Sequence, residues 1–312
     1  MTARERFRVH PEVAAAVAAG APLVALESTI VAHGMPWPEN LACAHEVAEA
    51  VRAGGALPAT VAVVDGVMTV GCTEDELERL ARGPDVAKVS RRDLAAVVAR
   101  GGWGATTVST TVFGAQRAGI RVFATGGIGG VHRGVEATWD ISADLPEIAA
   151  SDVAVVCAGA KSILDLPKTL EALETAGVPV VGWRTDTFPA FFVRSSGIPV
   201  VHRADEAVEV AAMMRAATDL GLRGGLVVAV PVPESAQADA AAVEAATAAA
   251  LEAAREQGVS GKALTPFLLK DIAARTGGES LAANRALVVH NASVAAAIAV
   301  AFAGTPVVPS RR

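Results

Sequence analysis

One local pattern recurs along the chain and constrains its fold more than any other feature. A short apolar segment, as at Leu23–Leu26, Ile120–Thr125 and Val153–Cys157, is followed by a loop of small or polar residues and then by a helical pattern. Strands joined through helices run parallel, so the pattern predicts an α/β fold whose loops gather at one edge of a sheet. An Asp-Gly turn joins Thr60–Asp65 to Val67–Gly71 and predicts one antiparallel hairpin.

Helices are predicted where apolar residues recur at helical spacing. These segments are Pro11–Ala19, Leu41–Ala53, Glu74–Ala81, Ala236–Gln257 and Ala286–Gly304. The last is nearly apolar, yet it contains histidine, asparagine and serine and lies near the lower length limit of a membrane span. We therefore expect a buried helix there and no membrane partner.

The composition limits the partners and the compartment. The 312 residues carry a net charge of -6. No basic cluster is longer than Arg91-Arg92, which argues against nucleic acid and favours a small-molecule ligand. Cys43, Cys72 and Cys157 are widely spaced and indicate neither a disulfide framework nor a zinc site, so we expect a cytoplasmic protein. No linker divides the chain, which is predicted to form one domain over residues 1–312.

Three charged residues follow or interrupt predicted strands. Lys161 comes after Val153–Cys157 and a turn of small residues, and Glu27 directly follows Leu23–Leu26. Lys88 lies inside a short apolar segment. Each is either a solvated surface charge or a side chain presented to a ligand, because ligands bind in the crevice at the carboxyl ends of parallel strands.

Two loops are rich in small or hydroxyl-bearing residues. The run 105–111 contains Val108 among threonines and serine, and it suits either a ligand contact or the N-terminus of the helix predicted over Val112–Ala118. A glycine-rich loop follows Thr125 and carries His132 and Arg133. Its spacing does not match a dinucleotide fingerprint, so a loop that binds phosphate or sugar is the better interpretation, with a solvated turn as the alternative.

The next segment places two carboxylates around a serine. Asp140 and Asp144 flank Ser142 and Ala143, a spacing that suits a hydrated divalent cation or the hydroxyls of a sugar. Asp144 also fits the N-cap of a helix, since a proline and a glutamate follow it. Near the end of the chain, Asn284 is either a helix-surface residue or a ligand contact.

Taken together, the chain resembles the pseudouridine-5'-phosphate glycosidase family over almost its whole length. The motifs that carry the resemblance are Leu26-Glu27-Ser28-Thr29-Ile30, His33-Gly34-Met35-Pro36, Thr125-Gly126-Gly127-Ile128-Gly129-Gly130-Val131-His132-Arg133, Asp140-Ile141-Ser142-Ala143-Asp144-Leu145, Ala158-Gly159-Ala160-Lys161-Ser162 and Thr265-Pro266-Phe267.

The resemblance implies a three-layer α/β/α fold with a mixed, largely parallel sheet, a homotrimer, and one Mn²⁺ per subunit. It also implies that Lys161 is the nucleophile, Glu27 the proton donor and Asp140 the manganese ligand. The substrate contacts predicted on this basis and from the loops are Lys88, Val108, Thr125, His132, Ser142, Ala143, Asp144 and Asn284.

The implied reaction is the reversible cleavage of pseudouridine 5'-phosphate to uracil and ribose 5-phosphate. A carbon-linked uracil is a poor leaving group, so the two-carboxylate route of ordinary glycosidases is too weak, and a lysine Schiff base is the expected intermediate. The attacking amine must be neutral, which a neighbouring cation such as Lys88 favours. Two alternatives stay open: a Schiff-base aldolase for another phosphosugar, and a noncatalytic phosphosugar-binding protein.

Overall fold

The computed structural model describes residues 6–304, so residues 1–5 and 305–312 of the predicted domain lie outside the described part. Its strands are β1 (Phe7–Val9), β2 (Leu23–Leu26), β3 (Leu57–Val64), β4 (Val67–Val70), β5 (Ala87–Val89), β6 (Gly104–Thr106), β7 (Val122–Ala124), β8 (Ala154–Cys157), β9 (Val180–Trp183), β10 (His202–Ala204) and β11 (Leu226–Ala229).

The α-helices are α1 (Pro11–Ala18), α2 (Glu39–Ala53), α3 (Glu74–Arg82), α4 (Leu94–Ala99), α5 (Val108–Ala118), α6 (Val135–Thr138), α7 (Asp144–Ala149), α8 (Leu166–Thr175), α9 (Ala207–Asp219), α10 (Ala240–Glu256), α11 (Leu264–Arg275) and α12 (Glu279–Ala303). A π-helical turn, η1 (Ile30–Gly34), and two short 3₁₀ turns, η2 (Glu234–Ala236) and η3 (Gly261–Ala263), complete the elements.

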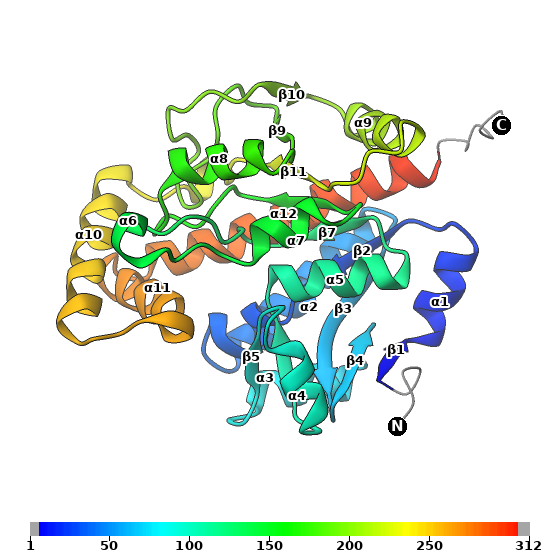
Figure 1. The fold of residues 1–312 in the computed structure, drawn as a ribbon, viewed down its shortest axis with the longest axis horizontal. Coiled ribbons are helices and arrows are strands. Elements are labelled where there is room, and N and C mark those ends of the chain that lie inside the picture. Colours follow the sequence, from blue (N-terminus) through cyan, green and yellow to red (C-terminus); the bar gives the residue numbers. More distant parts are fainter. Residues whose placement is uncertain (1–5, 305–312) are drawn as a thin grey trace.

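The strands form one mixed sheet between two helical layers. The main order is β1-β4-β3-β2-β7-β8-β11-β9-β10, and β6 joins β5 to β3 beside this path. Pairing is parallel except where β3 meets β4 and β6. In Figure 1, α5 and α7 lie in front of the sheet, and α2 and α12 lie behind it. The predicted α/β/α architecture and the predicted hairpin are therefore confirmed.

The centre of the sheet is apolar on both faces, as helices on both sides require. Every residue of β2, β8 and β11 is buried. Behind the sheet, α12 is long and apolar enough to span a membrane by composition alone, but 50% of its most apolar window is buried inside the protein. It packs against β2, β7, β8 and α2, so the buried helix predicted for this segment is confirmed.

The hydroxyl-rich run divides into β6 and the first turn of α5, which begins at Val108, so the prediction that this run forms the N-terminus of a helix is confirmed. Other predicted helix boundaries differ from the structure. The helix predicted over Ala286–Gly304 begins earlier, at Glu279. The long helix expected from Ala236 begins at Ala240, because Asp239 caps it and η2 precedes it. Three short strands, β1, β6 and β10, carry no clear sequence pattern and were not predicted. The helices α10 and α11 pack on each other and extend beyond the sheet (Figure 1).

Candidate active site

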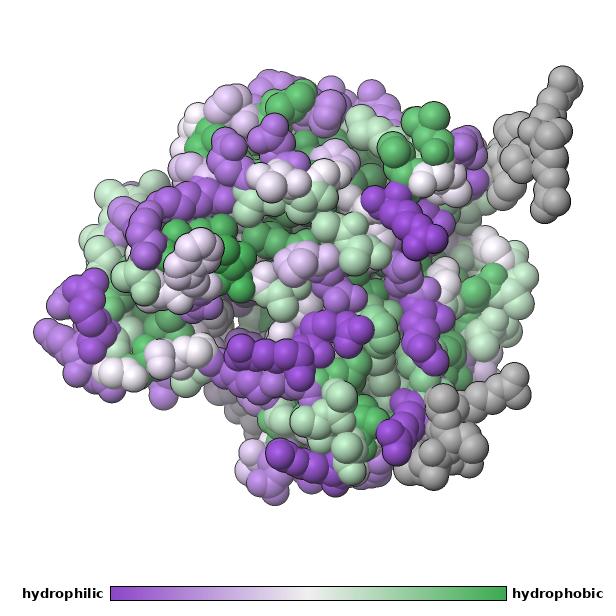
Figure 2. Space-filling model, viewed as in Figure 1, coloured by the Kyte–Doolittle hydropathy of each residue, from purple (hydrophilic) through white to green (hydrophobic). Residues whose placement is uncertain are grey.

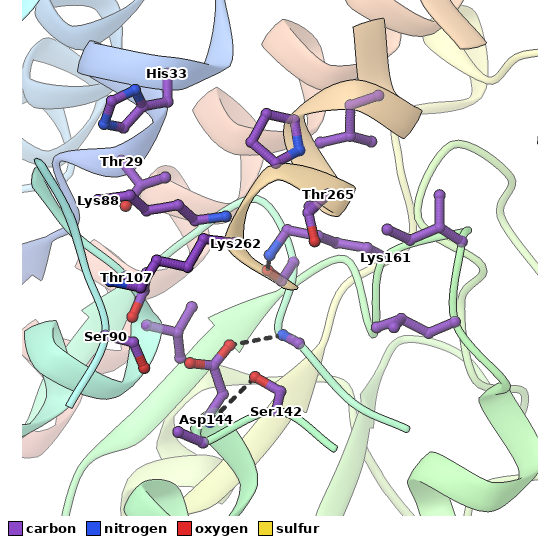
Figure 3. Close-up of a pocket in the computed structure, with 18 of the residues that line it drawn as sticks. Thr29, His33, Lys88, Ser90, Thr107, Ser142, Asp144, Lys161, Lys262 and Thr265 are labelled. Atoms are coloured by element: carbon purple, nitrogen blue, oxygen red, sulfur yellow. Dashed lines mark hydrogen bonds between the residues drawn. The ribbon is translucent and has the colours of Figure 1, made fainter. Parts of the chain in front are cut away.

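A cavity of about 260 Å³ lies at the carboxyl ends of β2, β7 and β8 (Figure 3). It brings together predicted site residues from segments that are far apart in the sequence. Those that line it are Glu27, Lys88, Val108, His132, Asp140, Ser142, Ala143, Asp144, Lys161 and Asn284. Thr125 is the exception: it is fully buried behind the cavity wall.

Lys161 is held by backbone contacts between two strand-end loops. Its amide donates to the carbonyl of Ile128 at 3.1 Å, and the amide of Ile128 donates to the carbonyl of Gly159 at 3.1 Å. Gly159 has a φ of +82°, a conformation that glycine adopts without strain. The Lys161 Nζ donates to the carbonyl of Gly127 at 2.7 Å. The lysine therefore lies half-buried in the cavity wall rather than on the outer surface.

Glu27 presents its carboxyl group to the same space at the end of β2. Burial raises the pKa of Glu27 above its ordinary value, against the opposing effects of the Lys161 charge and of a hydrogen bond from Thr125. A raised pKa keeps more of the carboxyl group protonated near neutral pH, which is the state a proton donor needs. Thr125 thus positions Glu27 instead of lining the cavity.

Lys88 reaches the cavity from β5. The pKa of Lys88 is lowered to about 8, chiefly by burial and also by the nearby charge of Lys161, although Glu27 and Asp144 oppose this shift. In Figure 3 the amines of Lys88 and Lys161 point into the same space from different walls. Lys88 was predicted to be either a solvated surface charge or a side chain presented to a ligand, and in the structure it faces the cavity.

Asp144 joins the glycine-rich loop to α5. Its Oδ1 accepts from the amide of Ser109 at 2.8 Å, and its Oδ2 accepts from the amide of Gly129 at 2.8 Å. A Cβ at Gly129 would lie 2.7 Å from Oδ2, so glycine is required for this approach. The predicted N-cap role of Asp144 is wrong, because Ala143 precedes α7 and Asp144 is its first residue. The carboxylate caps α5 instead.

Asp140 and His132 lie together at one edge of the cavity. The Asp140 Oδ2 lies 3.9 Å from the His132 Nε2, and the Asp140 side chain is 41% exposed. Burial lowers the pKa of His132, so the ring favours its neutral form, although Asp140 opposes this shift. Within residues 6–304 no cluster of three metal-binding side chains occurs. One exposed carboxylate fits only a hard cation that keeps most of its water ligands.

Several lining residues were not predicted as site residues. Ser90 and Thr107 add hydroxyl groups beside Asp144, while Lys262 and Thr265 reach the cavity from η3 and the start of α11 (Figure 3). Lys262 also lies 2.6 Å from the carboxylate of Asp93. The available signal was the Thr265-Pro266-Phe267 motif of the family resemblance, which by itself does not reveal that this segment packs over the cavity.

Comparison with known proteins identifies the family. The model of the family described as "Indigoidine synthase A like protein" matches residues 12–301. Curated relatives named pseudouridine-5'-phosphate glycosidase include one from Rhodospirillum centenum, 60% identical over 95% of this chain and 92% of its own. Another, from Sorangium cellulosum, is 55% identical over 97% of this chain and 95% of its own.

Solved structures agree with the sequence relatives. A prealnumycin C-glycosynthase in complex with ribulose 5-phosphate is 41% identical, with a TM-score of 0.88 over 95% of this chain and 97% of its own. An indigoidine synthase A-like protein from Thermotoga maritima is 37% identical, with a TM-score of 0.88 over 97% of this chain and 98% of its own. The chain therefore belongs to the pseudouridine-5'-phosphate glycosidase family of enzymes, as the sequence motifs predicted.

Proposed function

We propose that the protein cleaves and forms the C–C glycosidic bond of pseudouridine 5'-phosphate through a Schiff base on Lys161. The observation that carries the proposal is the cavity itself, which both Lys161 and Glu27 line, close enough for the Lys161 charge to act on the Glu27 carboxyl group. The names of the curated relatives support the reaction. The complex of a structural neighbour with ribulose 5-phosphate supports a sugar-phosphate ligand.

The two ends of the cavity suit the two halves of this substrate. Ser90, Thr107 and Ser142 offer hydroxyl groups at one end, where α5 also begins. Hydroxyl groups donate hydrogen bonds to phosphate oxygens, so this end suits the phosphate. His33 lies at the other end (Figure 3), and Asn284 lines the active-site cavity and the neighbouring cavity together with His33, so we assign this end to the carbonyl and N–H groups of uracil. Lys161 lies between them, near the position of the anomeric carbon.

The first step opens the ribose ring. The lone pair of the Lys161 Nζ forms a bond to the anomeric carbon, the bond from that carbon to the ring oxygen breaks, and Glu27 gives its proton to that oxygen. The Glu27 carboxylate then accepts the proton that the nitrogen must lose. Lys88 lines the same cavity and, where it is charged, attracts the anionic groups of the substrate.

The second step releases uracil. The nitrogen lone pair forms the iminium double bond, the bond from the anomeric carbon to C5 of uracil breaks, and C5 takes the proton held by Glu27. Water then adds to the iminium carbon, and ribose 5-phosphate leaves as the Lys161 amine is restored. Two smaller barriers thus replace one large barrier.

A divalent cation belongs to the same proposal. Asp140 would hold the predicted Mn²⁺, with water as most of the other ligands, and the ion would neutralise charge on the substrate. The support is the exposed carboxylate at the cavity edge. Chelation of the ion, followed by assays with Mn²⁺ or Mg²⁺ restored, tests the requirement.

The predicted homotrimer and the cytoplasmic location are further parts of the proposal. Large apolar side chains are exposed on and near α9, where Figure 2 also shows apolar surface; these are Val201, Val208, Leu220 and Leu222. An exposed apolar patch of this kind supports assembly, which sedimentation velocity tests. Cys43, Cys72 and Cys157 are free thiols, which supports a reducing compartment.

Borohydride trapping with ribose 5-phosphate tests the central claim. Reduction of the iminium fixes the sugar on the enzyme, and we expect the added mass on the peptide that contains Lys161. Mass on another peptide overturns the assigned nucleophile, and binding without trapping favours the noncatalytic alternative. Release of uracil from pseudouridine 5'-phosphate separates the glycosidase from an aldolase, since an aldolase traps the sugar but releases no uracil.

A further inference from the structure

A second cavity, of about 460 Å³, lies against the active-site cavity on the side of α11. The residues that line it are Ala32, His33, Gly34, Met35, Pro36, Phe192, Pro266, Leu269, Lys270, Ala273, Ser280, Leu281 and Asn284. Some of these also line the active-site cavity, namely His33, Gly34, Pro266, Leu269 and Asn284. Because residues shared by two cavities form the partition between them, a few side chains alone separate the two spaces.

This partition stands at one particular end of the active site. In Figure 3, His33 lies on the far side of Lys88 and Lys161 from Ser142 and Asp144. Ser142 and Asp144 belong to the end assigned to the phosphate. The second cavity therefore continues the end where the base lies, beyond the carbon that Lys161 attacks.

The second cavity differs chemically from the active site. Met35 and Phe192 are buried in its wall, and Ala273 and Leu281 add further apolar surface. Lys270, the one lysine, arginine or carboxylate residue among its described lining residues, is exposed. The Ser280 hydroxyl is already bonded to Thr276 Oγ1 at 3.0 Å. Such a space favours an uncharged hydrocarbon group over a polar one.

We infer that the second cavity accepts a short alkyl chain on the base, so that the enzyme also couples ribose 5-phosphate to N-alkylated uracils. The inference rests on the proposed function and adds a substrate class to it. Uracil forms its new bond at C5, and one ring atom separates C5 from each of the two nitrogens, N1 and N3, which take no part in that bond. A chain on either nitrogen can extend away from Lys161 while the reacting carbon stays in place.

The coupling is balanced without any further reactant. The Lys161 amine condenses with the aldehyde of ribose 5-phosphate and releases one water. Electrons of the C5 double bond form the bond to the iminium carbon, and C5 then loses its proton to the Glu27 carboxylate. The sugar hydroxyl closes the ring on the same carbon, and its proton leaves with the departing Lys161 amine. The alkyl chain takes no part in these steps.

The test uses the full-length enzyme with ribose 5-phosphate and uracil, 1-propyluracil or 3-propyluracil, followed by mass spectrometry of the products. We expect the wild type to couple at least one propyluracil at a rate within about tenfold of that for uracil. Ala273→Phe fills the second cavity and should lower this rate by about tenfold or more, with the uracil rate unchanged. Ala274→Phe is the matched control, because Ala274 is exposed on the same helix and does not line the cavity.

A second variant guards against poor folding of the first. Leu281→Ala enlarges the cavity and should improve coupling of a longer chain, such as 1-hexyluracil, relative to uracil. The inference is overturned if the wild type couples uracil but neither propyluracil, or if Ala273→Phe slows uracil and propyluracil equally. No coupling of uracil itself would instead overturn the proposed function on which the inference depends.

Discussion

The floor and the cover of the active-site cavity are built differently. The floor consists of Glu27 and two strand-end loops, 125–130 and 158–161. Backbone hydrogen bonds join the two loops to each other, and the side chain of Asn291 donates to the carbonyl of Thr125 at 2.8 Å. The cover is the segment 261–269, which includes η3 and the start of α11. It is tied across the cavity by the ion pair of Lys262 and Asp93, whose side chains are 49% and 15% exposed.

This difference suggests that the floor serves the chemical steps and that the cover controls how the substrate reaches the cavity. Reacting groups must keep their geometry, and the floor supplies that through buried contacts at the edge of the sheet. A partly exposed ion pair contributes little, so the cover is held across the cavity less firmly than the floor is held together. Changes in the floor should therefore affect turnover most, and changes in the cover should affect substrate affinity.

The largest effect is expected for Lys161→Ala. Removal of the amine leaves no group that forms the Schiff base, so kcat should fall by about 10⁴-fold or more. Uracil release measured by absorbance checks this. Lys168→Ala is the control, because Lys168 lies on α8 beyond the same loop and pairs with Asp165 outside the cavity. Comparable losses in both variants would contradict the assignment.

Glu27→Gln should be the next most severe change. The amide is nearly isosteric but cannot donate a proton to the ring oxygen, so kcat should fall by about 10² to 10⁴-fold. Thr125 separates positioning from chemistry, since its hydroxyl donates to Glu27. Thr125→Val should lower kcat less than Glu27→Gln does, and Thr125→Ser should restore it. A Thr125→Ser variant as slow as Thr125→Val would argue against the positioning role.

Asp144→Asn should weaken the floor itself. Asp144 is 6% exposed, and its carboxylate accepts hydrogen bonds from the backbone N–H groups of Ser109 and Gly129. The side-chain –NH₂ of asparagine cannot accept a hydrogen bond, so it would leave one of these two N–H groups without its partner. The free energy of unfolding should fall by about 2 kcal/mol, measured in urea. Asp140→Asn is the matched control, because Asp140 is far more exposed, and its loss should stay within about 0.5 kcal/mol. Equal losses of unfolding free energy in the two variants would contradict the structural link that Asp144 forms between the glycine-rich loop and α5.

Lys88→Gln should give an effect that depends on pH. The pKa of Lys88 is lowered to about 8, chiefly by burial, so Lys88 is charged below that pH and loses its charge as the pH rises through it. The wild type should exceed the variant in kcat/KM by about tenfold at pH 6.5, and the ratio should shrink above pH 8. Lys270→Gln, at an exposed lysine outside the active-site cavity, should give a ratio that does not change with pH.

The same contrast explains what the sequence could predict. The residues of the floor could be predicted from the sequence, because a buried strand followed by a loop or a polar residue shows where the carboxyl end of that strand lies. Lys161 and Glu27 were identified as candidates in this way. The α/β class and the antiparallel hairpin came from similarly local patterns. The first residue of α5 did not, because the amide of Ser109 is capped by Asp144, 35 residues further along the chain.

The residues of the cover could not be predicted from the sequence, because their position depends on how distant helices pack. Helical spacing predicts α10, but it does not show that α10 packs on α11 or that this packing brings Lys262 and Thr265 over strand ends far earlier in the chain. Thr125 shows that a local pattern can also predict a ligand contact that the structure does not contain. Its position after β7 suggested a substrate contact, yet the residue is buried and supports Glu27. Local patterns locate the sheet edge, whereas tertiary packing decides which side chains face the ligand.

The smallest expected effect belongs to the cover. Lys262→Met removes the ion pair with Asp93 and should raise KM by about threefold, with kcat within about twofold of the wild type, because exposed ion pairs contribute up to about 1 kcal/mol. Arg275→Met is the matched control, since Arg275 pairs with Asp271 on α11 and does not line the cavity.

Asp93→Asn then tests whether the ion pair acts as a unit. If the cover is held by this contact, the double variant should resemble either single variant in KM, since the second change removes nothing further. Additive effects would show that Lys262 contacts the substrate independently of Asp93. A fall in kcat as large as that of Glu27→Gln would show more: the cover would then take part in the chemistry, and the division between floor and cover would fail.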